Sequence, residues 1–294
     1  MVSSDIFSAS NAEDINRKRR FIVLGAGGAG ALALIVPALL RAETVSLSSA
    51  INRSGKLRAL SQRIAKAYIQ LSLGVLSKNA NNIIAASQEL VRRTLHDLEL
   101  RDGISAVADA LFALEAEAKQ LIASTSAPAV MTNAMQVSSL ADQVMAGAEK
   151  TTEYYESLSK SPHAQIVNVC GRQRMLSQRV AKCYMLIQAG HDNKTVRTQM
   201  ADSRSQFNAA MEILLKAPIS TPTIRQYLEI AKSQWAVFQV SLDLTPDATM
   251  MRNVATTSER VLELMDNLTN QYDQALKDML GKADDRGCAF ALMG

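Results

Sequence analysis

Residues 52–68 read Asn52-Arg-Ser-Gly-Lys-Leu-Arg-Ala-Leu-Ser-Gln-Arg-Ile-Ala-Lys-Ala-Tyr68, and residues 168–184 read Asn168-Val-Cys-Gly-Arg-Gln-Arg-Met-Leu-Ser-Gln-Arg-Val-Ala-Lys-Cys-Tyr184. Ten of these 17 positions are identical, at a constant offset of 116 residues. Agreement at this level indicates a duplicated module. The residues kept in both copies are Asn52/Asn168, Gly55/Gly171, Arg58/Arg174, Leu60/Leu176, Ser61/Ser177, Gln62/Gln178, Arg63/Arg179, Ala65/Ala181, Lys66/Lys182 and Tyr68/Tyr184.

The chain length agrees with this duplication. A chain of 294 residues can hold two domains of ordinary size, and its composition, with 4% aromatic residues and six prolines, favours helices. The sequence predicts an all-α protein made of two tandem four-helix-bundle modules, packed with pseudo-twofold symmetry through their first helices. The expected divisions are an N-terminal segment (1–42), module 1 (43–160), module 2 (161–285) and a tail (286–294).

Breaks in the helical pattern predict four helices in each module. In the first module we expect helices over 45–77, 83–100, 104–123 and 130–159, with a break at 78–82. In the second module we expect helices ending near 190, 216 and 242, followed by one over 248–280. Ser161-Pro162 allows two alternatives, because proline suits the first turn of a new helix but also occurs at a kink in a continuous one.

The N-terminal segment has the layout of an export signal. Arg17–Arg20 is a basic cluster, and residues 21–40 carry no charge. Arg19-Arg20 resembles a twin-arginine signal, with a cleavage site expected after Ala42. The alternative is an uncleaved membrane anchor over 21–40. Both alternatives predict a periplasmic location for residues 43–294, and with a net charge of only +4 we expect no nucleic-acid partner.

The repeated segment, placed on a helix, has two distinct faces. Leu57, Leu60 and Ile64 belong to an apolar stripe of the kind that forms a bundle core. Gly55, Arg58 and Gln62 lie on a second, polar stripe, and Gly171, Arg174 and Gln178 repeat it. A glycine inside a helix costs up to about 1 kcal/mol relative to alanine, so its presence in both copies suggests a close approach to the backbone.

Pairing of the two first helices would bring Arg58 and Arg174 together. Two buried guanidinium groups repel one another, and an anion between them would remove that penalty. Because the donor fork of arginine is planar, a planar oxyanion is the best fit. The predicted site is therefore an anion clamp at a helix–helix interface.

Other repeated polar residues have competing interpretations. We expect Arg63/Arg179 and Lys66/Lys182 to form a solvated face. Ser61/Ser177 and Gln62/Gln178 either hold the arginines or form hydrogen bonds between helices. We expect Tyr68/Tyr184 and Asn52/Asn168 to serve mainly in packing and capping.

The pattern Asn-x-x-Gly-x-x-Arg-x-Leu-Ser-Gln-Arg resembles the P-box of the PilJ-type domain, which is shared with nitrate- and nitrite-responsive sensors. The resemblance implies four-helix bundles that pair through their first helices, with nitrate between one arginine from each bundle. Carried over by position, the ligand-binding residues are Arg58, Arg174, Gly55 and Gly171. The supporting residues are Ser61, Ser177, Gln62, Gln178, Asn52 and Asn168.

This chain differs from receptors of the family because it fuses two modules and no signalling output follows them. We therefore expect an exported binding protein for nitrate or nitrite that passes ligand occupancy to a receptor, kinase or transporter partner. The alternative is a structural protein that docks onto a receptor or a pilus-chemotaxis partner without a ligand. The three cysteines and three histidines lack metal-ligand spacing, so we expect no metal, no cofactor and no enzymatic activity.

Overall fold

The computed structural model describes residues 29–100, 105–159 and 161–291, and within these ranges it contains α-helices and one short 3-10 helix but no strand. The predicted all-α fold is therefore confirmed. The first four α-helices, which we call module 1, are α2 (Ala29–Ser72), α3 (Ser77–Glu99), α4 (Ser105–Ser126) and α5 (Ala134–Ser159), with the 3-10 helix η1 (Met131–Asn133) ahead of α5. Module 2 consists of α6 (Pro162–Gln188), α7 (Lys194–Lys216), α8 (Pro222–Asp243) and α9 (Ala248–Ala291).

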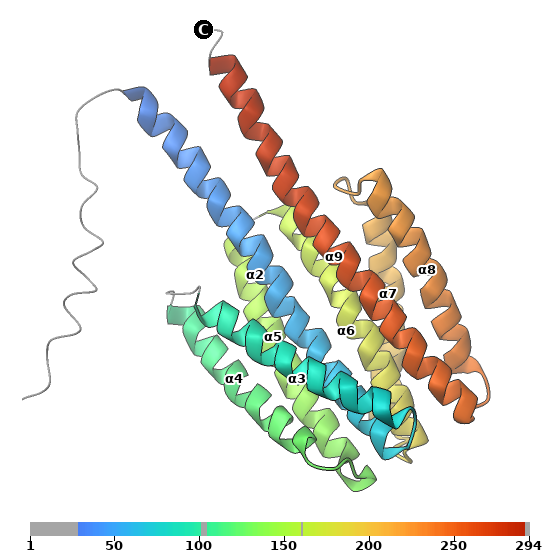
Figure 1. Ribbon diagram of the computed structural model, residues 1–294. Helices are drawn as coiled ribbons and strands as arrows, with labels where there is room; N and C mark the ends of the chain where they lie inside the picture. Colours follow the sequence, from blue (N-terminus) through green and yellow to red (C-terminus); the bar gives the residue numbers. More distant parts are fainter. Residues whose placement is uncertain (1–28, 101–104, 160, 292–294) are drawn as a thin grey trace, which may run out of the picture. The chain divides into compact units, whose positions relative to one another are not determined.

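The first and last helices of the two modules pack together. Within residues 41–294, side chains of α2 bond to α5, α6 and α9, and α5 also packs on α6. The α3–α4 and α7–α8 pairs lie on opposite sides of these four helices (Figure 1). The repeated segments lie on α2 and α6, so the fold places both copies in the centre of this region.

Apolar residues at helical spacing explain the central packing. Leu57, Ile64, Leu176 and Val180 are completely buried, as the apolar stripe predicts. Cys170 and Cys183 are buried free thiols, which agrees with their interpretation as small apolar residues. The helices are thus held together by an apolar core. The polar stripe of each repeat is buried in the same region.

The prediction of a break at 78–82 was wrong. The connection between α2 and α3 lies at residues 73–76, where Gly74 has φ 71° and Leu76 has φ 48°. Asn79, Asn81 and Asn82 instead lie on exposed positions of α3, where their weak helix propensity costs only tenths of a kcal/mol. Gly190, at the end of α6, has φ 87° and lies 116 residues after Gly74. The duplication therefore includes the turn that ends the first helix of each module.

Three helix ends add to or correct the sequence analysis. Helix α6 starts at Pro162, which selects a new helix over a continuous kinked one. Helix α2 begins at Ala29, well before the expected start at residue 45. Helix α9 continues to Ala291 rather than ending near residue 280, because a single glycine such as Gly281 costs a long helix only about 1 kcal/mol.

The N-terminal part divides from the rest of the chain. Residues 1–40 and 41–294 form separate compact units. The basic cluster, the twin-arginine pair and the first part of the apolar run lie outside the described residues. Among the residues described, no helix is both long enough and apolar enough to span a membrane.

Candidate functional site: a buried arginine pair

Arg58 on α2 and Arg174 on α6 are the two largest completely buried side chains in the described part of the chain, with 0% and 1% exposure. A buried charge is tolerated only when it is paired and hydrogen-bonded. Burial lowers the pKa of Arg58, Glu149 opposes that effect, and the nearby positive charges of Arg172 and Arg174 add to it. The Nη2 atoms of the two arginines lie 2.7 Å and 3.7 Å from the position that a Cβ atom would take at Gly55, so the arginines lie close together, as the sequence predicts.

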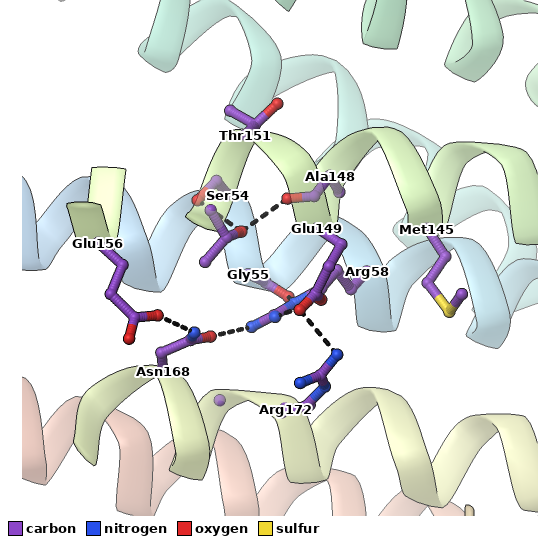
Figure 2. Close-up of polar contacts among 12 residues, drawn as sticks. Ser54, Gly55, Arg58, Met145, Ala148, Glu149, Thr151, Glu156, Asn168 and Arg172 are labelled. Atoms are coloured by element: carbon purple, nitrogen blue, oxygen red, sulfur yellow. Dashed lines mark hydrogen bonds and ion pairs between the residues drawn. The ribbon is translucent and has the colours of Figure 1, made fainter. Parts of the chain in front are cut away.

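Arg58 has partners on three helices (Figure 2). Its Nη1 donates to Oε2 of Glu149 on α5 at 2.6 Å, and its Nη2 donates to Oδ1 of Asn168 on α6 at 2.7 Å. Its Nε donates to the carbonyl oxygen of Gly55, one turn back on α2, at 3.4 Å. The guanidinium is thus hydrogen-bonded to α2, α5 and α6.

Arg174 repeats these contacts from the other module. Its Nη1 donates to Oδ1 of Asp266 on α9 at 2.7 Å and to Oδ1 of Asn52 on α2 at 3.0 Å. Its Nη2 donates to the carbonyl oxygen of Asn52 at 3.1 Å, and its Nε donates to that of Gly171 at 3.2 Å. Each arginine therefore binds a carboxylate of its own module and an asparagine of the other one.

Asn52 and Asn168 had two expected roles. The helical pattern assigned them mainly to packing and capping, whereas the family resemblance made them supporting residues of the site, and both contact the arginine of the opposite module. Asn168 also donates from Nδ2 to Glu156, whereas Asn52 donates to Asn270 Oδ1 at 3.1 Å. The two asparagines are therefore direct partners of the arginine pair.

Two carboxylates of the site were missed by sequence reasoning. They are Glu149 and Asp266. Glu149 also forms an ion pair with Arg172 at 2.8 Å, and Asp266 forms one with Lys56 at 3.2 Å, and each of these pairs joins the two modules. Burial alone would raise the pKa of Asp266, but Arg174 and Lys56 outweigh it and the pKa is lowered. The chain therefore supplies two carboxylates to the arginine pair, which the sequence analysis did not foresee.

Gly55 and Gly171 are required by the arginines themselves. A Cβ atom added at Gly55 would lie 2.7 Å from Nη2 of Arg58 and 3.7 Å from Nη2 of Arg174. A Cβ atom at Gly171 would lie 2.9 Å from Nη2 of Arg174. The close approach to the backbone that the sequence suggested is therefore made by the guanidinium one turn along the same helix.

A Gly55→Val substitution is expected to lower the free energy of unfolding by about 1–3 kcal/mol, because Arg58 would have to move away from the new side chain and weaken its bonds to Glu149 and Asn168. Chemical denaturation of the full chain measures the change. Gly74→Val is not a suitable control, since Gly74 has a positive φ. Ala86→Val, at an exposed position of α3, is the matched control for a β-branched residue in a helix, and an equal loss in both variants would contradict the steric explanation.

A second buried charge layer lies further along α2 and α6. The Lys66 ammonium pairs with Glu259, and that of Lys182 pairs with Asp142 at 2.6 Å, so both pairs cross between modules. The side chains of Lys66 and Lys182 have 0% exposure, and the expectation of a solvated face was wrong for them. Because both ammonium groups lie between the central helices, water cannot solvate them, and a buried charge is stable only when it is paired with an opposite charge.

Arg63 and Arg179 lie at the margin of this layer. Arg63 donates to Glu259 from Nε at 2.9 Å and to Ser87 Oγ at 3.2 Å. Arg179 donates from Nε to Ser203 Oγ at 2.7 Å. Both arginines are half-buried, so the solvated-face expectation holds for neither of them in full.

Among the described residues, the serines and glutamines of the repeat form hydrogen bonds with groups other than the arginine side chains. Ser61 and Ser177 donate to the carbonyl oxygens of Arg58 and Arg174 on their own helices, both at 2.9 Å. Gln62 donates to the carbonyl oxygen of Ala141 on α5 at 3.1 Å, and Gln178 donates to that of Ser258 on α9 at 2.9 Å. The glutamines therefore form hydrogen bonds between helices, which was one of the two roles expected for them.

A cavity of about 290 Å³ borders the site on the side of Arg174. It lies between α2, α3 and α9. Basic and acidic side chains share its walls with leucines. The charged residues that line it are Lys56, Arg63, Arg174, Glu259, Glu263 and Asp266.

Comparison with known protein families identifies this architecture. The family described as the N-terminal domain of type IV pili methyl-accepting chemotaxis transducers, PilJ, matches the chain twice, over residues 41–152 and 155–286. The chain therefore belongs to the PilJ family and carries two copies of its domain in tandem. This is a sensory and signalling family. No curated protein and no solved structure has significant similarity to the chain.

Proposed function

We propose that this protein is a non-enzymatic, periplasmic sensor that binds a small planar oxyanion, nitrate or nitrite first, between Arg58 and Arg174. The proposal rests on one observation above all, which is the burial of two guanidinium groups beside the same glycine backbone. Membership of a sensory family supports the class of function. The ligand follows from the resemblance to the P-box and from the chemistry of the site.

Hydrogen-bond donors remain for a ligand. An arginine has five N–H groups. Arg58 makes three hydrogen bonds and Arg174 makes four with described residues. Two N–H groups remain on Arg58 and one on Arg174, enough to bind two oxygens of a planar anion placed between them.

The local charge also favours an anion. Four cations, Lys56, Arg58, Arg172 and Arg174, are linked to two carboxylates, Glu149 and Asp266. A third carboxylate, Glu156, accepts a hydrogen bond from Asn168 and does not contact these cations directly. Positive charge therefore remains in excess, and the cavity beside Arg174 offers a small anion a route to it.

We infer that the two modules pair by pseudo-twofold symmetry, so that one chain supplies both halves of the site. Equivalent contacts at offsets of 116 and 117 residues support this arrangement. They include Arg58–Glu149 with Arg174–Asp266, and Lys182–Asp142 with Lys66–Glu259. A bound anion would be expected to compete with the carboxylates for the arginines and so to alter how α2 and α6 pack, which a receptor, kinase or transporter partner would then detect.

A second candidate function has its own support. Because Glu149 and Asp266 already pair with the arginines, the buried network is compatible with a purely structural role. The protein would then dock onto a receptor or a pilus-chemotaxis partner through its fold and bind no anion.

Thermal unfolding of the full chain separates the two candidates. Nitrate or nitrite at a hundred times Kd is expected to add about 2.7 kcal/mol to the free energy of unfolding. For a chain of this size the shift in Tm is several degrees. Chloride and sulfate at matched ionic strength are expected to give smaller shifts.

The decisive variant is Arg58→Lys/Arg174→Lys, which keeps both charges but removes the planar donor forks. It is expected to fold and to lose the nitrate-specific shift. Arg53→Lys, in an exposed pair with Asp97, is the matched control and should retain it. Equal responses to all four salts in the unmodified chain would overturn the clamp and favour the docking protein.

A further inference from the structure

A second cavity, of about 420 Å³, lies in module 2, away from the arginine pair. It lies between α6, α7, the end of α8 and the connection from α8 to α9, and it is open to solvent on one side. Its volume is within the range of pockets that hold small organic molecules. Its main lining residues are Tyr184, Ile187, Met200, Arg204, Leu242 and Pro246.

Tyr184, the last residue of the second repeat, lines this cavity with its hydroxyl group unused. The residue is 3% exposed, and its hydroxyl oxygen has no hydrogen-bond partner among the described residues. Leaving a buried polar group unsatisfied costs about 1–3 kcal/mol. Burial and the neighbouring Asp247 raise the pKa of Tyr184, so its hydroxyl stays protonated and able to donate at neutral pH.

The first repeat offers a direct comparison. Tyr68 occupies the equivalent position in module 1, and its hydroxyl oxygen accepts a hydrogen bond from the backbone N–H of Val130 at 3.2 Å. Val130 lies in the connection between α4 and α5. In module 2 the corresponding connection borders the cavity through Leu244 and Pro246 and does not bond to the tyrosine. Within the part of the chain that the structure describes, the tyrosine hydroxyl is therefore unpaired in module 2 only, although both modules share the same fold.

Each of the two arginines in the cavity wall is paired with an aspartate. Arg204 forms two hydrogen bonds with Asp243, at 2.8 and 2.9 Å. Arg197, also in the wall, forms a two-bond pair with Asp192. Since both guanidinium groups are neutralised by carboxylates, the wall provides no net charge for an ionic ligand. The remaining contacts come mainly from aliphatic side chains.

We propose that this cavity is a binding site for a small uncharged molecule with an apolar body and one hydrogen-bonding group, which pairs with the Tyr184 hydroxyl. The aliphatic wall excludes strongly hydrated ligands, and the unpaired hydroxyl selects among apolar ones. The residues that line this site do not include either arginine of the pair.

Ligand-detected NMR titration of the full chain with phenol, cyclohexanol and toluene tests the proposal. Phenol and cyclohexanol are expected to bind, and Tyr184→Phe is expected to weaken both by about fivefold to tenfold, the loss typical of one hydrogen bond. Toluene, which has no hydroxyl, is expected to bind the unmodified chain and Tyr184→Phe equally. Ala201→Trp, which adds bulk at the cavity wall, is expected to abolish binding of all three probes.

Tyr68→Phe is the matched control, because it removes the same atom from the other module. It is expected to leave probe binding unchanged and to lower Tm, since Val130 loses its partner, whereas Tyr184→Phe is expected to keep or raise Tm. The proposal is overturned if no probe binds, if Tyr184→Phe binds phenol and cyclohexanol as tightly as the unmodified chain, or if Tyr68→Phe reduces their binding equally.

Discussion

Arg58→Met is expected to lower the free energy of unfolding by about 3–5 kcal/mol, the loss typical of breaking a buried ion pair. The substitution keeps much of the side-chain volume but leaves Glu149 with Arg172 alone and Asn168 Oδ1 without its donor. Since Glu149 keeps one cation, the lower end of the range is the better estimate. Urea denaturation at neutral pH measures the effect.

Arg53→Met is the matched control for this prediction. Arg53 lies on the same helix, but its pair with Asp97 is about half exposed on both sides. Exposed pairs contribute about 0–1 kcal/mol, so the control should lose little. Comparable losses in the two variants would mean that the buried network does not hold α2, α5 and α6 together.

The second large effect is expected at acid pH and depends on Glu259. Burial alone would raise the pKa of Glu259, but Lys66 and Arg63 outweigh it and lower the pKa to about 2. A carboxyl group with a depressed pKa contributes stability that is complete above its unfolded value of 4.5 and is lost as the pH falls toward 2. A shift of this size corresponds to about 3 kcal/mol.

Glu259→Gln is therefore expected to lower the free energy of unfolding by about 3 kcal/mol at pH 7 and to flatten its decline between pH 4.5 and pH 2. Denaturation at a series of pH values measures both features. Glu263→Gln, one turn along α9, is the control and should retain the decline. An unchanged pH dependence in Glu259→Gln would assign the acid sensitivity to other carboxylates.

Sequence reasoning was strongest where the repeat itself carried the information. The identity between the two segments predicted the duplicated domain, the shared helical plan and the meeting of Arg58 with Arg174. Gly55 and Gly171 marked a close approach correctly, although the group that approaches is a guanidinium and not a ligand. Local identity was sufficient for these features because they lie on one helix in each module.

The carboxylates could not be found from the repeated segment, because they lie on the last helices. Burial of a lysine such as Lys66 depends on how four helices pack, and helical periodicity in one segment does not contain that information. A signal was nevertheless present. Acidic residues recur at an offset of 117, as Asp142/Glu259 and Glu149/Asp266, and each set is spaced by seven residues on one helix face. The one-residue change from the offset of 116 conceals the correspondence.

The break after α2 was missed for a different reason. Asparagine-rich sequence predicts a turn, but Asn79, Asn81 and Asn82 lie on an exposed surface, where a helix tolerates them. Gly74 was the better indicator, because the same offset of 116 leads to Gly190 at the end of α6. Applying the repeat to the turn as well as to the helix would have placed the break correctly.

The fusion of two domains in one chain has an evolutionary consequence for the central network. In a symmetric homodimer every substitution appears twice, so the two sides of the axis must remain identical. Here each side can change alone, and the sides have already diverged: Lys56 corresponds to Arg172, Ser54 to Cys170, and Glu149 to Asp266. Covalent linkage therefore allows the two sides of this interface to differ chemically, which the identical chains of a symmetric homodimer do not allow.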